Sequence, residues 1–218
     1  MSSENLKDFP SADIRYSFLQ LFLNELDLPQ QYHHFKFVYW AKQEGIYDDL
    51  KSLVEARGKD FKKEYENLFV SSALASAILK LKPEFAENEA KVKENFKANF
   101  KRIESISREQ LIDTIKTEIL PLKFGNKLPL TIIVLDEVQQ FIGSDGDKSI
   151  DVQNLAQDIC SNFDGKFLLI GTGQNALSET SLLQRLQDRF TVKVSLTDTD
   201  VETVTRKTVL EKKPSAMA

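Results

Sequence analysis

Cysteine is almost absent from this sequence, which has only Cys160 among its 218 residues. A single cysteine excludes an intrachain disulfide and a cluster of thiolate zinc ligands, and it suits a reducing compartment. No stretch approaches the roughly 20 consecutive apolar residues that a membrane-spanning helix requires. The first ten residues, MSSENLKDFP, contain no apolar core of signal-peptide length. These absences predict a cytoplasmic protein with no membrane association.

Glycine and proline are also scarce, with eight and six residues, which excludes fibrous and low-complexity classes. Neither sign of charge is in large excess, because the net charge is -4 and the pI is near 5.4. The overall charge therefore does not support binding to DNA, which would need a local basic patch. The 41% of hydrophobic residues is enough for a globular protein with a buried core.

Residues 1–129 predict a mainly helical region. Ile14, Phe18 and Phe22 recur at helical spacing after Ser11, a possible N-cap. A later serine, in SREQ at 107–110, predicts a capping box with the glutamine that follows it. The alternating segment FKFVYW leaves a short strand as an alternative within this region.

Residues 130–197 change in character and predict alternating strands and helices. The β-branched run LTIIVLDE predicts a strand buried on both faces, and the strings KFLLIG and FTVKVSL predict a second and a third strand. The amphipathic segment DVQNLAQDICSNF predicts a helix between the first two, with Cys160 on its apolar side, and residues 198–218 predict the start of a further helix. This order is typical of a doubly wound α/β sheet, which binds ligands at the carboxyl ends of its strands.

Two acidic residues, Asp136 and Glu137, end the first predicted strand. Asp136 could bind a Mg²⁺ ion with its water shell, and Glu137 could act as the base that activates an attacking water molecule. The alternative is that the two acids only end the strand and solubilise a turn.

Further polar residues follow the second predicted strand and precede the third. Thr172 and Gln174, in IGTGQN, would lie beside the acids if the first two strands are neighbours, and either could hydrogen-bond the attacking water or a terminal phosphate. Arg185 and Arg189, in LQRLQDRF, could reach across a subunit interface to neutralise charge on a phosphoryl group. The alternatives are a polar turn and a salt-bridged surface helix.

In this order these features resemble the later part of an AAA-type P-loop ATPase core, with Walker B strand, sensor strand, arginine-finger helix and last strand. Strings such as ADIRYSFLQLFLNEL, YHHFKFVYW, LPLTIIVLDEVQQFIG and LLIGTGQNAL resemble more narrowly the large BrxC/PglY-like ATPase subunits of BREX bacteriophage-exclusion systems. The resemblance covers most of the chain. It implies ATP and Mg²⁺ as ligands, and a role in a multi-protein defence complex that also contains a DNA methyltransferase.

The resemblance also assigns roles to individual positions. Asp136 would be the Walker B acid on the Mg²⁺ side, and Glu137 would be the catalytic base. Gln174 or, alternatively, Thr172 would be the sensor residue. Arg189 or Arg185 would be the arginine finger, and the spacing does not choose between them.

The phosphate-binding loop of this family, G-x-x-x-x-G-K-[ST], does not occur in the sequence, where no two glycines are five residues apart. We therefore expect a fragment of the family pattern that is inactive as an ATPase by itself and leaves sheet edges unpaired. Expected partners are other BREX subunits or copies of the full-length ATPase, which would be a homo-oligomer. The alternative function is a noncatalytic interaction module that docks on those subunits.

Overall fold

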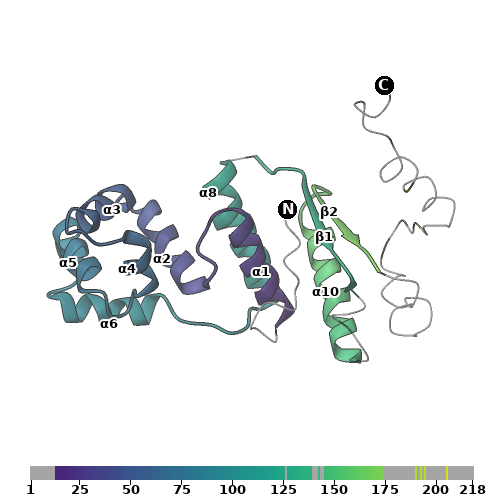
Figure 1. Ribbon diagram of the computed structural model, residues 1–218, viewed down its shortest axis with the longest axis horizontal. Coiled ribbons are helices and arrows are strands. Elements are labelled where there is room, and N and C mark those ends of the chain that lie inside the picture. Colours follow the sequence, from purple (N-terminus) through teal and green to yellow (C-terminus); the bar gives the residue numbers. More distant parts are fainter. Residues whose placement is uncertain are drawn as a thin grey trace, which may run out of the picture.

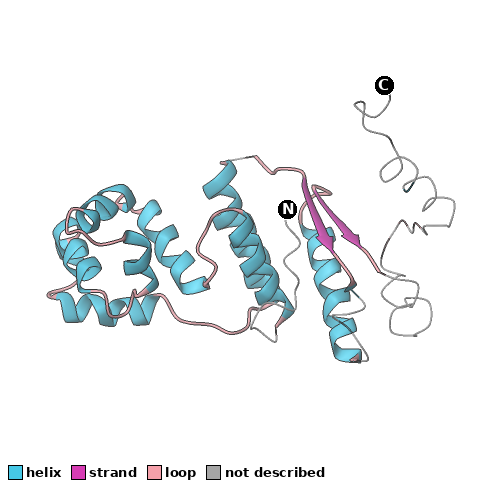
Figure 2. Cartoon of the chain, viewed as in Figure 1, coloured by secondary structure: helices cyan, strands magenta, loops and turns pink. Residues whose placement is uncertain are grey.

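The computed structural model describes residues 13–125, 127–138 and 145–173, and the single positions Ile142, Phe190, Val192, Val194 and Thr205. These residues form a mostly helical structure that contains one small sheet of two parallel strands (Figures 1 and 2). The helical region predicted before residue 130 is present. The helices are α1 (Ile14–Glu25), α2 (Tyr32–Gln43), α3 (Tyr47–Glu55), α4 (Phe61–Glu66), α5 (Ser72–Leu81), α6 (Glu89–Asn99), α7 (Arg108–Asp113), α8 (Leu120–Phe124) and α10 (Gly146–Asn162).

Two segments of tighter or wider winding supplement these helices. A short 3₁₀ turn, η2 (Pro83–Phe85), begins at the proline, whose fixed φ suits a first helical position. A π-helical segment, η3 (Thr114–Ile119), joins α7 to α8. The segment FKFVYW lies inside α2, so the alternative of a short strand there is wrong. Among the residues that the structure describes, no helix combines the length and apolar composition needed to cross a bilayer.

Side chains cap the N-termini of helices α1 and α7. The carboxylate of Asp13 accepts hydrogen bonds from the backbone N–H groups of Arg15 and Tyr16, so the N-cap of α1 is Asp13 and not Ser11. The second carboxylate oxygen of Asp13 accepts from the N–H of Ile106, which ties α1 to the segment before α7. The predicted capping box of Ser107 and Gln110 is present at the start of α7.

Two hydrophobic cores lie side by side along the molecule. One unites α1, α7, η3 and α10 with the inner face of the sheet, and its fully buried members include Leu19, Ile115 and Phe163. The other lies among α2 to α6, around Phe37 and Phe96. Helix α2 contributes to both cores. The lobe formed by α2 to α6 is therefore inserted between α1 and α7, at the left of Figure 1.

The sheet consists of β1 (Thr131–Leu135) and β2 (Phe167–Gly171), with α10 as the crossover between them. The strands pair in parallel, with Thr131 opposite Phe167 and Leu135 opposite Gly171. This pairing confirms the expected neighbourhood of the first two strands. One face of the sheet packs against α10 and α1, and the Phe22 and Phe167 rings lie 6.1 Å apart there.

The AAA-type α/β sheet expected from the sequence is wrong as a description of this chain. The described residues are mostly helical, and they form a two-stranded sheet in place of the expected three-stranded part of an AAA-type core. Of the expected third strand, residues 191–196, only Val192 and Val194 are described, and neither is in a strand. The physical reason for the difference is that most of the apolar area is buried by helices packing on helices, in the two cores described above.

Candidate functional site at the carboxyl ends of β1 and β2

Asp136, Glu137 and Thr172 lie together where the two strands end. Asp136 and Glu137 follow β1 directly, and Thr172 follows β2. The Thr172 hydroxyl donates a hydrogen bond to Oδ1 of Asp136. The hydroxyl oxygen of Thr172 also accepts a hydrogen bond from the backbone N–H of Glu137 at 3.1 Å. A hydroxyl can donate once and accept twice, so one side chain holds both acidic residues in place.

Backbone hydrogen bonds also hold the ends of the two strands together. The N–H of Thr172 donates to the carbonyl of Leu135 at 2.9 Å, and the N–H of Val138 donates to the carbonyl of Thr172 at 3.1 Å. Between them Glu137 has φ of 49°, in the left-handed region. An L-residue with a Cβ pays about 1–2 kcal/mol for this conformation, so the surrounding hydrogen bonds must hold it. Backbone strain of this kind concentrates at functional sites.

The site is open to solvent. Asp136 and Thr172 are exposed and Glu137 is half-buried. Mg²⁺ in phosphate-transfer sites commonly uses one or two protein oxygens together with water and substrate phosphates, so Asp136 and Thr172 fit a Mg²⁺ ion that arrives with a nucleotide. They do not form a complete cage: no three His, Cys, Asp or Glu side chains gather as metal ligands in the described part of the chain.

The other predicted site residues cannot be placed against these three. Gln174, Arg185 and Arg189 lie outside the described residues. The structure therefore brings together Asp136, Glu137 and Thr172 alone, and the roles assigned to the glutamine and the arginines stay predictions. The sequence analysis named Thr172 as the alternative to Gln174 for the sensor residue. In the structure Thr172 contacts both Asp136 and Glu137.

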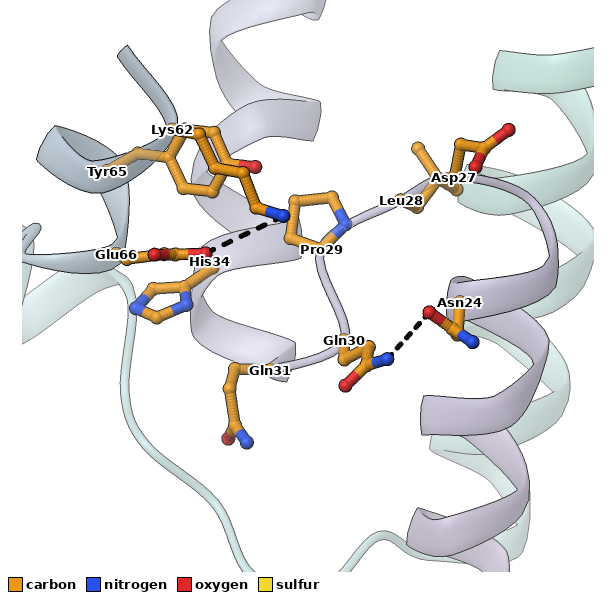
Figure 3. A pocket seen from close by; sticks show the side chains of 10 residues that line it. All are labelled: Asn24, Asp27, Leu28, Pro29, Gln30, Gln31, His34, Lys62, Tyr65 and Glu66. Atoms are coloured by element: carbon orange, nitrogen blue, oxygen red, sulfur yellow. Dashed lines mark hydrogen bonds and ion pairs between the residues drawn. The ribbon is translucent and has the colours of Figure 1, made fainter. Parts of the chain in front are cut away.

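A cavity of about 620 Å³ lies elsewhere, between the end of α1, the loop after it and α4 (Figure 3). Nothing in the sequence predicts this cavity. Its polar groups bond mainly to each other: Gln30 Nε2 donates to Asn24 Oδ1 at 2.6 Å, and Lys62 Nζ lies 4.0 Å from Glu66 Oε1. It shares no residue with the strand-end site.

Two adjacent histidines border this region, and burial lowers the pKa of both. The His33 and His34 rings lie 4.0 Å apart, and His33 stacks on Phe69 at 5.4 Å. Burial, and then the positive charge that His34 and Arg102 place nearby, lower the pKa of His33 to about 4. Burial also lowers the pKa of His34, although Glu66 opposes the shift. Neutral rings in this position suit packing between α2 and α4.

A buried acid away from the strand-end site, Asp158 on α10, is not predicted by the sequence analysis. Its side chain is 4% exposed, and its two oxygens form ion pairs with Arg15 Nε at 3.2 Å and Arg108 Nε at 2.8 Å. Cys160, which the sequence places on the apolar side of this helix, is exposed, so that expectation is wrong. The only signal of the buried acid in the sequence is its place beside the apolar stripe of Leu155 and Ile159.

Comparison with known proteins gives no identification at this point: no protein-family model, no curated protein and no solved structure matches this chain.

Proposed function

We propose that Asp136, Glu137 and Thr172 are the half of a nucleotide-hydrolysing site that orients the metal ion and the attacking water. The observation that supports this is the hydrogen bond from Thr172 to Asp136, made across the carboxyl ends of two neighbouring parallel strands. Ligands of parallel α/β units bind at this edge. The resemblance to BREX ATPases adds the reaction class, which is ATP hydrolysis.

Each of the three residues has a separate task in this proposal. Thr172 holds the Asp136 carboxylate, so that its exposed side chain can share a Mg²⁺ ion with the phosphates of ATP. Glu137 takes the proton of the attacking water, and the bond from its N–H to Thr172 fixes its backbone. Gln174 as sensor and Arg189 or Arg185 as arginine finger complete the proposal.

The phosphate-binding half is supplied by another polypeptide in this proposal, because the sequence contains no G-x-x-x-x-G-K-[ST] loop. The chain by itself is then inactive and works inside a cytoplasmic BREX complex. Its partners there are other BREX subunits or copies of the full-length ATPase.

A noncatalytic interaction module is the second candidate. It is favoured by the exposed apolar side chains of the sheet, among them Ile132 at 48% and Val134 at 56%. Such side chains are typical of surfaces that bind another protein. In this case Asp136, Glu137 and Thr172 would contact the partner protein or would be remnants of a site that no longer catalyses a reaction.

Phosphate release from ATP in the presence of Mg²⁺ separates the two candidates. The purified chain should show none. It is then mixed with a full-length BREX ATPase subunit whose own catalytic glutamate has been replaced by glutamine, so that turnover has to use Glu137. We expect activity that Glu137→Gln removes and that Glu87→Gln, an exposed acid outside the site, leaves unchanged. Binding without any restored turnover would reject the catalytic proposal and favour the interaction module.

A further inference from the structure

The cavity beside α1 and α4 lies where the two hydrophobic cores meet. Its walls come from the end of α1, the loop that leads to α2 and one side of α4 (Figure 3). Helix α1 belongs to the first core and α4 to the second. The volume of about 620 Å³ is in the range of known ligand sites, which often lie between two packed units. The chemistry of the lining indicates which ligand fits.

Negative charge is in excess among the residues that line this cavity. Asp27 and Glu66 contribute two carboxylates, against the single ammonium group of Lys62. The Lys62 and Glu66 side chains are 73% and 46% exposed and approach each other only to 4.0 Å, so solvent screens their attraction. The cation of the cavity therefore balances its two acids only in part.

The end of α1 adds to this negative charge. The last carbonyl groups of a helix carry partial negative charge, which basic side chains in the last turn commonly balance. The last turn of α1 has no basic residue, and the residue after its C-cap Leu26 is the acid Asp27. A cationic ligand in the cavity would supply the positive charge that this helix end lacks.

Asp27 itself has an unfavourable conformation. Its N–H donates to the Asn24 carbonyl at 3.0 Å, and the N–H of Leu28 donates to the Leu23 carbonyl at 2.9 Å. This is the Schellman pattern, in which glycine is the usual residue at the position of Asp27. Asp27 has φ of 51°, so it bears the cost of a left-handed conformation and also places its charge at the negative end of a helix. A ligand cation that pairs with the carboxylate offsets the second cost.

Neutral side chains of the lining offer hydrogen-bond acceptors. His34 is 9% exposed, and burial lowers its pKa, so its ring is neutral at neutral pH and keeps one nitrogen as an acceptor. Gln30 uses its amide nitrogen to donate to Asn24, which leaves its amide oxygen for a ligand. The cavity therefore matches a group that is positively charged and donates several hydrogen bonds.

A guanidinium group fits this lining better than an ammonium group. It presents five N–H donors in one plane, and its flat face stacks on aromatic rings. The two carboxylates stand on separate walls, with Asp27 after α1 and Glu66 at the end of α4. Tyr65 and Pro29 add an aromatic ring and an apolar ring to the lining, which suit the flat group and an alkyl stem.

We propose that this cavity binds a guanidinium group on an alkyl stem, as in the side chain of arginine, with its positive charge between Asp27 and Glu66. The group displaces Lys62 from Glu66 and donates to the acceptors of Gln30 and His34. An arginine of a peptide and a free guanidino compound share this chemistry. The cavity shares no residue with the strand-end site, so the proposal goes beyond the proposed function and does not depend on it.

An NMR titration of the full chain, labelled with ¹⁵N, tests the proposal with N-acetylarginine N-methylamide. The guanidinium is the only charge of this probe, and the corresponding citrulline derivative has a neutral group of the same shape. We expect the arginine probe to bind with a Kd of about 1 mM or tighter, and the citrulline probe not to bind. Signals should shift at the backbone amides of Gln31 and Glu66 and not at Thr172. The corresponding lysine probe should bind several-fold more weakly.

Variants of the lining test which groups hold the cation. Asp27→Asn should weaken binding about tenfold, since it removes a charged acceptor. Asp164→Asn is the matched control, because Asp164 is also exposed, follows the C-cap of a helix and has φ of 50°. Lys62→Met should strengthen binding about threefold, because it removes the cation that competes for Glu66.

Asp27→Gly separates binding from folding. Glycine adopts the left-handed conformation freely, so this variant should raise the urea midpoint of unfolding and still lose binding about as much as Asp27→Asn. Loss of binding in a more stable chain cannot come from a disturbed fold. Wild-type affinity in Asp27→Gly would reject the role of the carboxylate.

Two further probes identify the source of the group. Binding of butylguanidinium, but not of the peptide acetyl-Gly-Gly-Arg-Gly-Gly-amide, assigns the site to a free compound, and binding of the peptide assigns it to an arginine side chain. Equal binding of the arginine and citrulline probes, or none of either, would overturn the proposal. An equal loss in Asp27→Asn and Asp164→Asn would also overturn it. A lysine probe that binds as tightly as the arginine probe would show a general cation site and reject the guanidinium assignment.

Discussion

The Thr172 hydroxyl joins Asp136 to Glu137 across two strands, because it donates to the carboxylate of the first and accepts from the backbone N–H of the second. The three residues come from segments 35 positions apart, and the parallel pairing of β1 and β2 brings them together. The Thr172 hydroxyl therefore fixes the two acids in addition to the backbone hydrogen bonds that Thr172 makes with Leu135 and Val138.

Removal of that hydroxyl should loosen the site with a small loss of stability. Thr172→Val keeps the shape of the side chain and removes both hydrogen bonds, which should lower the free energy of unfolding by about 1 kcal/mol at this exposed position. Thr172→Ser keeps the hydroxyl and should restore the wild-type value. The measurement is the urea midpoint of unfolding. Thr117→Val is the control, because its hydroxyl bonds only the Asp113 carbonyl within its own helical turn; an equal loss there would contradict the special role of Thr172.

Glu137 is a second place where stability and site geometry are coupled. Its φ of 49° is costly for a residue with a Cβ, and glycine adopts this conformation freely. Glu137→Gly should therefore raise the free energy of unfolding by about 0.5–1 kcal/mol, after allowance for the greater freedom of glycine in the unfolded chain.

Two matched variants test this explanation of Glu137. Asp164→Gly, at φ of 50°, should stabilise the chain in the same way, and Glu25→Gly, at the last residue of α1, should destabilise it. If Glu137→Gly lowers the urea midpoint, the side chain contributes more than its backbone conformation costs. In the proposed complex the same variant should abolish phosphate release, which would show strain retained for function.

Local patterns in the sequence predict the elements that carry the site. The β-branched run before Asp136 predicts β1, the capping box at Ser107 predicts α7, and the strand pairing follows from the short βαβ connection. These features depend on neighbouring residues, which is why they can be predicted. The carboxyl ends of the two strands then meet by geometry alone.

Contacts between distant segments are not predictable in this way. Arg15 and Asp158 are 143 positions apart, and only the packing of α1 on α10 shows that they meet. The same packing buries Asp158 and leaves Cys160 exposed, the opposite of what the helical pattern suggests. The expected AAA-type sheet was wrong for a related reason. Segments with strand-like sequences do not show that most of the apolar area is buried between helices.

Asp158 should be the most sensitive polar position in the helical core that covers the sheet. Its carboxylate pairs with Arg15 on α1 and with Arg108 on α7, and it is almost fully buried. Asp158→Ala leaves the two guanidinium groups without their partner, and it should lower the free energy of unfolding by about 2–4 kcal/mol.

The arginines give a graded check on this prediction. Arg108 is 48% exposed, so Arg108→Met should cost only about 0.5–1 kcal/mol, because solvent screens an exposed pair. Asp151→Ala, on the same helix but outside this ion-pair cluster, should have a small effect. Thermal unfolding measures the loss of stability in each variant. If Asp158→Ala loses no more stability than Asp151→Ala, the buried ion pairs of Asp158 do not stabilise the packing of α10 on α1 and α7.

The helical lobe should lose stability in mild acid because of His33. Its ring is buried against Phe69, and burial together with His34 and Arg102 lowers its pKa to about 4. The unfolded chain has a histidine pKa of about 6.5, so between these values the unfolded state binds a proton that the folded state does not. The stabilising contribution is therefore complete above about pH 6.5 and is lost as the pH falls toward 4.

His33→Phe tests this origin of the acid sensitivity, since it keeps the ring contact with Phe69 and removes the titrating nitrogens. His33 Nε2 is buried without a hydrogen-bond partner, so no bond is lost in the exchange. The wild-type free energy of unfolding should fall by up to about 1.4 kcal/mol per pH unit through this range for this one group. The variant should fall less steeply, with the remainder due to His34 and to carboxylates. Urea midpoints at several pH values give both slopes, and parallel curves would show that the acid sensitivity arises elsewhere.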